Sequence, residues 1–160
     1  MRQNALFQLG MDLGTPSTSR KEDVTIASPL SLEAKERDDH FVVRNGVRCA
    51  GVHLIVDLFE AERLDDVDHI EETLRLAVSA AGATLLHIHL HHFEPNGGVS
   101  GVAVLAESHI SVHSWPEANY AALDVFMCGR ADPDKCVPVL CDGFKAKRIA
   151  VSEVLRGQGA

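Results

Sequence analysis

The chain has 160 residues, a length typical of one domain, and its 46% hydrophobic and 24% charged residues match a soluble globular protein. This composition excludes a wholly disordered or a fibrous chain. Fifteen Lys and Arg residues against 23 Asp and Glu residues give a net charge of −8, which repels nucleic acids and anionic lipids. We therefore expect no nucleic-acid partner and no role at a membrane surface.

Two further features bear on location. No apolar run approaches the ~18 residues that a membrane-spanning helix needs. Four cysteines lack CxxC spacing and indicate reduced thiols rather than a disulfide framework: Cys49, Cys128, Cys136 and Cys141. We expect a cytoplasmic protein.

The first 45 residues differ in composition from the rest. Glycine, proline and serine punctuate residues 10–19, and residues 33–39 are nearly all charged. Few spaced apolar residues are present to offset the entropy lost on ordering. We predict a flexible arm over residues 1–45, followed by one folded domain over residues 46–160.

The domain opens with a β-rich apolar run over residues 52–59, which predicts a strand. Asp65 or Asp66 then caps a predicted helix, and Gly82 ends it. The apolar residues of this helix recur with a 3.6-residue period: Val67, Ile70, Leu74, Ala77, Val78 and Ala81.

Residues 84–93 alternate apolar and polar side chains, which predicts a strand with one buried face. The two faces are Leu86, Ile88 and Leu90 against His87, His89 and His91. Two histidines at i, i+2 can bind zinc, but the sequence offers no third ligand beside them. We interpret the histidines as a polar strand face and expect no metal site.

Three more strands are predicted over residues 99–106, 120–127 and 145–154. The glycine-rich run 97–101 lacks the Lys-Ser/Thr ending of a phosphate loop, so we expect a tight turn that leads into a strand. Asp132 and Pro133 begin a second helix, which Pro138 makes short or kinked. The order β-α-β-β-β-α-β predicts an α+β fold: a two-layer α/β sandwich, mostly antiparallel, with both helices on one face.

The segment 107–117 is chemically dense. It holds the only Trp, two His, three Ser and two carboxylates between two apolar strands, and composition alone predicts a polar loop. A serine close to a histidine suggests a hydrolase, but the GxSxG nucleophile elbow is absent.

This segment reads ESHxxxHSWPE, and with residues 121–129 it resembles the prokaryotic S-adenosylmethionine decarboxylase family, whose members are pyruvoyl-dependent and cleave themselves. The resemblance extends through residues 98–101 and 145–148 and covers about residues 51–154. It implies decarboxylation of S-adenosylmethionine to the aminopropyl donor for spermidine synthesis. The implied cofactor is a covalent pyruvoyl group, which forms a Schiff base with the substrate amine and serves as the electron sink.

The resemblance also implies a processing reaction. Ser108 Oγ attacks the carbonyl carbon of Glu107 and converts the amide to an ester; β-elimination then leaves a dehydroalanine that hydrolyses to the pyruvoyl group of residue 108. The products are a β chain of residues 1–107 and an α chain of 53 residues. His113 is the implied proton-transfer group in processing, and Ser100 assists it by hydrogen bonding.

Further roles follow from the same resemblance. Cys128 matches the catalytic thiol that protonates the substrate α-carbon after carbon dioxide leaves. Glu117 matches an acid that binds the ribose hydroxyls, and Phe93 matches an aromatic residue near the adenine. Trp115 is assigned to the core and to no ligand. The family also implies a homodimer of cleaved protomers.

Three departures lie near the expected substrate pocket. The first strand reads Gly51-Val52-His53 and lacks the arginine common there, the turn at residues 94–98 is one residue longer, and residues 118–120 read Ala-Asn-Tyr. They keep open two alternatives: a pyruvoyl-dependent L-arginine or L-ornithine decarboxylase, and an unprocessed binding or regulatory homologue. The intact Ser108, His113 and Cys128 argue against the second alternative.

Overall fold

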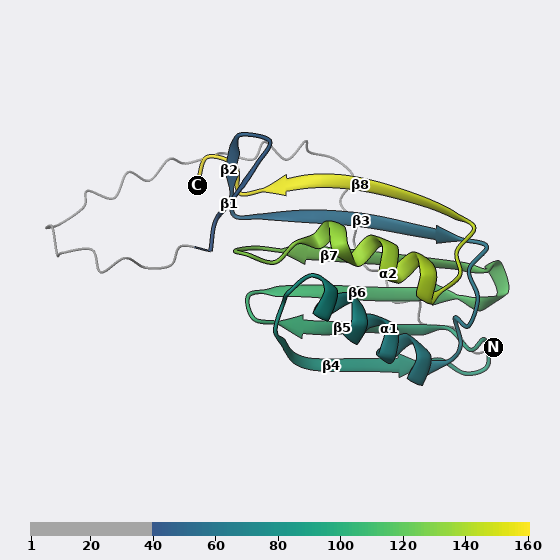
Figure 1. The fold of residues 1–160 in the computed structure, drawn as a ribbon. Helices are drawn as coiled ribbons and strands as arrows, with labels where there is room; N and C mark the ends of the chain where they lie inside the picture. The colour runs from purple at the N-terminus through teal and green to yellow at the C-terminus, as the bar shows by residue number, and fades with distance from the viewer. Residues whose placement is uncertain (1–39) are drawn as a thin grey trace, which may run out of the picture. The chain divides into compact units, whose positions relative to one another are not determined.

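A computed structural model describes residues 40–160, which form a two-layer α+β sandwich (Figure 1). The predicted flexible arm therefore lies, up to residue 39, outside the described residues. The strands are β1 (Val42–Arg44), β2 (Val47–Cys49), β3 (Gly51–Phe59), β4 (Leu85–His92), β5 (Val99–Leu105), β6 (Ser108–Trp115), β7 (Tyr120–Met127) and β8 (Arg148–Arg156). The helices are α1 (Val67–Ala80) and α2 (Cys136–Gly143), with short 3₁₀ turns η1 (Pro116–Ala118) and η2 (Pro133–Lys135).

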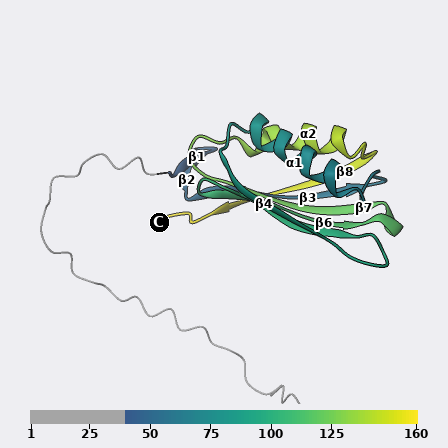
Figure 2. The same cartoon turned by 90° about the horizontal axis from the view of Figure 1, so that it is seen from below.

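Six strands form one antiparallel sheet in the order β4-β5-β6-β7-β3-β8. Both helices cover the same face of this sheet, and among the described residues no helix or strand covers the other face (Figure 2). We call these the core face and the open face. The predicted fold class is confirmed.

The core lies between the sheet and the two helices. Strands β3, β6 and β7 turn every second residue toward the helices, as the pleat of a strand requires. The largest fully buried side chains belong to both layers: Phe144, Leu54, Leu58, Ile70, Leu74, Leu105, Ile110, Leu123, Met127, Leu140, Val56 and Val99.

Both helices begin where the sequence predicts. The Asp66 carboxylate accepts a hydrogen bond from the His69 amide at 3.0 Å and caps α1, and Gly82 follows the helix with a φ of +71°. Asp132 caps η2, which leads directly into the eight-residue α2. Pro138 is the third residue of α2, where no intrahelical hydrogen bond needs its missing N–H. The helix is short, as predicted.

The polar loop predicted for residues 107–117 is wrong, because residues 108–115 form the central strand β6. Ile110 and Val112 face the core, flanked by Ser108 and Ser114, each with only 7% of its surface exposed. Ser114 Oγ donates to the Leu64 carbonyl at 2.7 Å and accepts from the Val99 amide at 2.8 Å. Because these bonds satisfy the buried hydroxyl, a strand rich in serine can cross the core.

Strand β4 carries a β-bulge between Leu85 and His87. The extra residue, Leu86, is 63% exposed, so its prediction as a buried residue is wrong, whereas Ile88 and Leu90 pack against the core as predicted. A bulge leaves one residue unpaired and shifts the alternation behind it, which period-two patterning cannot reveal.

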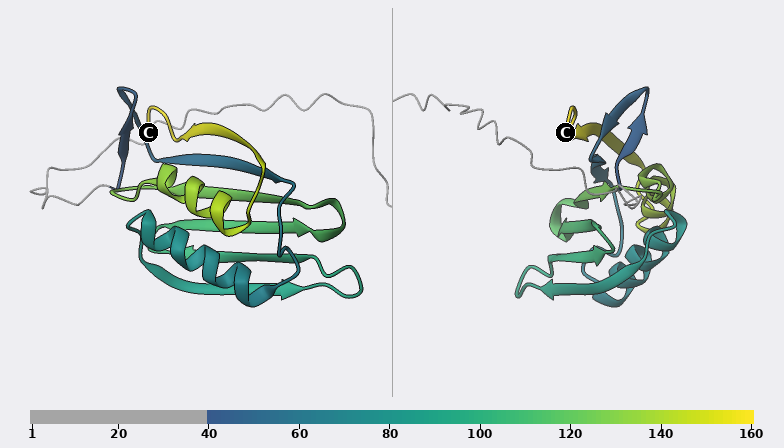
Figure 3. Two further views of the ribbon diagram at one scale, coloured as in Figure 1. Left: turned by 45° about the vertical axis from the view of Figure 1, so that its right-hand side comes forward. Right: turned by 90° about the vertical axis from the view of Figure 1, so that its left-hand side faces the viewer.

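The short β1–β2 hairpin spans residue 46, the predicted start of the domain, so the folded part begins a few residues before that boundary. It lies at the end of the sheet where β8 finishes (Figures 1 and 3). The Ala50 amide donates to the Arg156 carbonyl at 2.8 Å, and the Arg44 guanidinium forms ion pairs with Asp134 and Glu153. None of the helices in residues 40–160 is long and apolar enough to cross a membrane.

Candidate active site

Three of the predicted site residues meet at the turn between β5 and β6. Glu107 belongs to this turn, Ser108 is the first residue of β6, and Cys128 directly follows β7, which pairs with β6. The Cys128 thiol donates to the Glu107 carbonyl oxygen at 3.1 Å, and the Cys128 amide donates to Ser108 Oγ at 3.2 Å. The Ser108 hydroxyl oxygen and the Cys128 sulfur are 3.6 Å apart. We call Glu107, Ser108 and Cys128 the cleavage cluster.

The backbone of the cleavage cluster is strained. Glu107 has a φ of +64°, in the left-handed region that a side chain with a Cβ disfavours. The peptide bond that follows Glu107 is the bond that the sequence predicts to break. The cluster therefore combines a hydroxyl nucleophile, a hydrogen bond to the carbonyl that it would attack, and a destabilised backbone at the same residue.

Ser100 and His113 meet as predicted, but away from the cleavage cluster. They are paired neighbours on β5 and β6, and 2.8 Å separates Ser100 Oγ from His113 Nδ1. Ser108 and His113 are five residues apart on one strand, a separation of about 17 Å, and an odd spacing places them on opposite faces. Ser108 belongs to the core face and His113 to the open face, so one chain does not bring them together.

The open face carries a polar network that sequence reasoning missed. Asp124 Oδ1 lies 3.2 Å from His53 Nε2, and its other oxygen accepts from the Ser111 hydroxyl at 2.9 Å. His109 stacks on the neighbouring Phe126 ring with 5.7 Å between ring centroids. Burial lowers the pKa of His109, and the charge of His53 lowers it further, while Asp124 acts in the opposite direction. The available signal was a pair of polar residues on one face of each predicted strand, His53 with Asp57 and Tyr120 with Asp124.

The same face carries a second carboxylate contact at its other end. The Tyr120 hydroxyl donates to Asp57 Oδ1, and this hydrogen bond, with a smaller contribution from burial, raises the pKa of Tyr120 to about 12. Trp115 is 42% exposed there, 5.3 Å from the Tyr120 ring between centroids. The assignment of Trp115 to the core is therefore wrong. Side chains alternate between the two faces of β6, and Trp115 lies on the face that points away from the helices.

Glu117 and Phe93 lie far along the sheet from Ser108. Glu117 belongs to η1, which connects the end of β6 to β7. Phe93 follows β4, is 48% exposed, and contacts the His91 ring at 4.5 Å between centroids. Neither residue contacts the cleavage cluster of its own chain.

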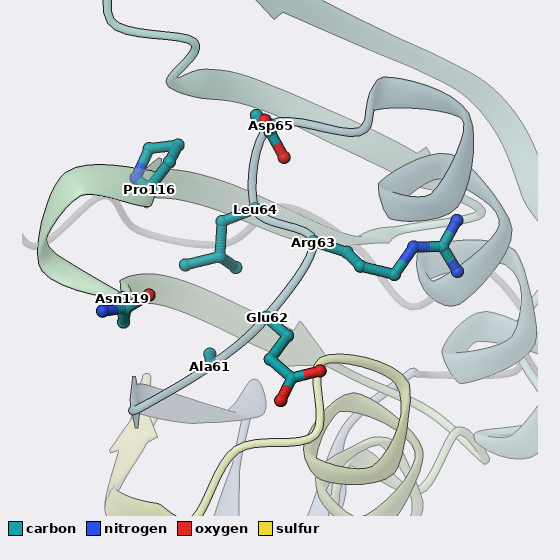
Figure 4. Close-up of a pocket in the computed structure, with 7 residues that line it drawn as sticks. All are labelled: Ala61, Glu62, Arg63, Leu64, Asp65, Pro116 and Asn119. Atoms are coloured by element: carbon teal, nitrogen blue, oxygen red, sulfur yellow. The ribbon is translucent and has the colours of Figure 1, made fainter.

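A small polar pocket of about 190 Å³ opens beside η1, between the β3–α1 loop and the β6–β7 turn (Figure 4). Leu64 extends toward that turn, while the Glu62 and Arg63 side chains point away from it. The lining residues are Ala61, Glu62, Arg63, Leu64, Asp65, Pro116 and Asn119. The pocket lies at the opposite end of β6 from Ser108 and does not belong to the cleavage cluster.

The glycine-rich turn has a structural explanation. A Cβ on Gly101 would lie 2.3 Å from the His89 carbonyl oxygen, and one on Gly98 would lie 2.9 Å from that of Ser114. These glycines therefore let neighbouring backbones approach each other. In the described part of the chain, no group of three or more His, Cys, Asp or Glu side chains is arranged to hold a metal ion.

One residue near the cleavage cluster had no signal in the sequence. His40 precedes the β1–β2 hairpin, and its Nδ1 lies 2.7 Å from Glu107 Oε2. It falls within the stretch predicted as an arm, 67 positions before Glu107, and only the folded hairpin brings the two together.

Comparison with known proteins agrees with this fold. The adenosylmethionine decarboxylase from Aquifex aeolicus superposes with a TM-score of 0.61 at 36% identity, over 68% of this chain and 92% of that one. The S-adenosylmethionine decarboxylase proenzyme of Thermomicrobium roseum is 44% identical over 112 residues, 69% of this chain and 97% of that protein. That of Parasynechococcus marenigrum is 47% identical over 109 residues, 66% and 84% of the two chains.

Fold and sequence thus define an α+β sandwich of the adenosylmethionine decarboxylase type. The S-adenosylmethionine decarboxylase family model matches residues 52–157, two thirds of the chain. The chain belongs to the S-adenosylmethionine decarboxylase family.

Proposed function

We propose that this protein is a self-cleaving proenzyme whose mature form decarboxylates S-adenosylmethionine with a pyruvoyl group made from Ser108. The product is the aminopropyl donor for spermidine synthesis. The observation that carries the proposal is the cleavage cluster, in which the Cys128 thiol donates to the carbonyl of Glu107 and the Cys128 amide donates to the hydroxyl of Ser108. It occurs in a chain of a family whose relatives are named proenzymes.

Cleavage begins when Ser108 Oγ attacks the carbonyl carbon of Glu107. A carbon–oxygen bond forms, the Glu107–Ser108 carbon–nitrogen bond breaks, and the hydroxyl proton passes to the freed amine. Negative charge develops on the Glu107 carbonyl oxygen during the attack, where the Cys128 thiol already donates a hydrogen bond. The unfavourable φ of Glu107 raises the energy of the starting peptide and so lowers the barrier.

The second stage removes the ester. The Ser108 α-proton leaves to a base, a double bond forms between Cα and Cβ, the Cβ–Oγ bond breaks, and Glu107 departs with that oxygen as a free carboxylate at the end of the β chain. Water then replaces the nitrogen of the resulting dehydroalanine, which releases ammonia and leaves a keto group at residue 108. The two products are residues 1–107 and residues 108–160.

Residues around Ser108 fit the keto group that this reaction leaves. Ser108 is 7% exposed, so the group formed there is shielded from water; the hydroxyl oxygen itself leaves with Glu107, and the keto oxygen is a new atom on the α-carbon. The pyruvoyl group supplies an electron sink for decarboxylation. The Cys128 sulfur lies 3.6 Å from Ser108 Oγ in the uncleaved chain, so the thiol is placed to give a proton to the substrate α-carbon after carbon dioxide leaves.

We further propose that the active protein is a homodimer of cleaved protomers, in which the second copy brings a proton-transfer group to the cleavage cluster. His113 and Ser100 lie on the open face, about 17 Å along β6 from Ser108, so proton transfer to the cleavage cluster needs a second copy. The same argument assigns Glu117 and Phe93 to the substrate of the partner's Ser108. Analytical ultracentrifugation should then give about 35 kDa, twice the 17.3 kDa of one chain, and a 17.3 kDa species would contradict the dimer.

We place the enzyme in the cytoplasm, a proposal supported by its four free cysteines. The catalytic proposal is tested by carbon dioxide release from S-adenosylmethionine, L-arginine and L-ornithine with the purified protein. We expect release from S-adenosylmethionine alone, and its loss after treatment with phenylhydrazine, which traps the keto group. Release from arginine or ornithine instead would reassign the substrate, and insensitivity to phenylhydrazine would contradict the pyruvoyl group.

A further inference from the structure

The segment before β3, which we call the N-terminal addition, lies outside the family match. The family match begins at residue 52, and the Thermomicrobium roseum relative is 97% covered by only 112 residues of this chain. Residues 40–49 nevertheless pack on the domain. Ion pairs from Arg44 to Asp134 and Glu153 hold the β1–β2 hairpin, and these hydrogen-bonded partners raise the pKa of Arg44.

His40, at the start of this addition, contacts both segments of the cleavage cluster. Its backbone carbonyl accepts a hydrogen bond from the Gly129 amide at 2.7 Å, directly after Cys128. Its ring Nδ1 donates to Glu107 Oε2, also at 2.7 Å, because the carboxylate can only accept. Gly129 has a φ of +62°, and a Cβ added there would lie 3.3 Å from the same ring nitrogen, so the imidazole is seated closely on this turn.

These contacts act on the geometry that controls cleavage. The attack of Ser108 Oγ depends on where the Glu107 carbonyl stands relative to the Cys128 thiol, and small displacements of reacting groups cost large factors in rate. Glu107 occupies a left-handed backbone conformation that its surroundings must enforce. His40 ties the Glu107 side chain to the backbone of the segment that carries Cys128, and so restrains both groups at once.

We propose that His40 is a positioning residue for self-cleavage, supplied by an addition that the family match does not include. This inference rests on the proposed function, because it concerns the same Glu107–Ser108 bond. His40 and Glu107 are each 53% exposed, so the contact is solvated and its effect on rate is modest. We expect a three- to tenfold slower cleavage without it, about the worth of one ordinary hydrogen bond.

The test is the first-order rate of cleavage in full-length protein made by pulsed cell-free translation, followed by gel and intact mass. His40→Ala should slow cleavage about three- to tenfold, whereas His40→Asn, whose amide can replace the Nδ1 donor, should restore most of the rate. Arg75→Ala is the matched control, because it breaks a similar ion pair with Glu71 (2.6 Å, 50% and 39% exposed) on α1, and it should cleave at the wild-type rate.

A double-mutant cycle separates positioning from a general loss of structure. In a Glu107→Gln background, His40→Ala should slow cleavage less than in the wild type, because the charged partner is gone. Equal slowing in both backgrounds, a wild-type rate for His40→Ala, or an Asn variant as slow as Ala would each overturn the role of His40. Wild-type protein that never cleaves would instead overturn the proposed function and this inference with it.

Discussion

The two ends of β6 place two predicted site residues, Ser108 and His113, in different surroundings. Ser108, at its start, faces the core, is 7% exposed and touches Cys128. His113, five residues later, faces the open side and contacts Ser100. The end at Ser108 is buried by its own chain, whereas the end at His113 is exposed on the open face. Five residues of β6 therefore separate the nucleophile Ser108 from the proposed proton carrier His113. We propose that a second copy of the chain supplies the missing proton carrier.

The largest expected effect concerns the nucleophile. Ser108→Ala removes the only oxygen placed to attack the Glu107 carbonyl within the cleavage cluster, so cleavage should fall by at least ~10⁴-fold. Intact mass should show one uncleaved chain of about 17.3 kDa after prolonged incubation. The control Ser79→Ala, at an exposed position of α1, should cleave at the wild-type rate. Cleavage of the Ser108→Ala variant at a comparable rate would show that Ser108 is not the nucleophile.

A smaller effect is expected from the thiol. Cys128→Ala deletes the donor to the Glu107 carbonyl, and the loss of one such donor slows acyl chemistry by about 100-fold. Cys128→Ser keeps a hydroxyl donor and should retain part of the rate. Cys141→Ala is the control, because Cys141 lies on α2 and its thiol contacts the Ala146 carbonyl, outside the cleavage cluster. All three variants are compared by the cleavage rate after pulsed translation. A wild-type rate for Cys128→Ala would mean that the hydrogen bond to the carbonyl is incidental.

The smallest expected effect concerns the open face and pH. The pKa of His109 is lowered in the folded protein, so below pH ~6.5 the unfolded chain binds more protons than the folded one. The neutral His109 ring therefore contributes to the free energy of unfolding at neutral pH, and this contribution is lost as pH falls below about 6.5. His109→Asn should flatten the fall in unfolding free energy between pH 7.5 and 5.5, measured with urea. An unchanged slope would contradict the inferred cause of the shift.

Much of this fold follows from residue patterns. The helix over residues 67–80 has a strict 3.6-residue stripe and a capping Asp66, and the strand over residues 120–127 alternates apolar and half-buried positions throughout. In both, the pattern depends on side chains that must be buried on one face. These elements were predictable because hydrophobic burial alone determines them.

The missed elements share a different cause. Strand β6 buries two serines, Ser108 and Ser114, and their burial depends on hydrogen-bond partners in other segments. The bulge at Leu86 depends on strand pairing, and neither effect leaves a local period in the sequence.

The candidate site divides in the same way. The motif predicted the contact of Ser100 with His113 and brought Glu107, Ser108 and Cys128 into one argument, since all five residues resemble the family pattern. It could not predict that His113 lies on the opposite face of the strand from Ser108, because the motif was read as a loop with no faces. His40 escaped prediction because its contact joins two positions far apart in the sequence and His40 lies before the family match.

The separation of the two ends of β6 is tested most directly by complementation. Ser108→Ala and His113→Ala chains, each inactive alone, are co-expressed with different tags. If a partner's His113 serves each Ser108, random pairing makes half the dimers mixed and each mixed dimer holds one intact site, so about a quarter of wild-type cleavage should return. Ser108→Ala with Cys128→Ala is the control that should not complement, because both changes fall in one cleavage cluster. No recovery in the first mixture would contradict a site shared between two copies.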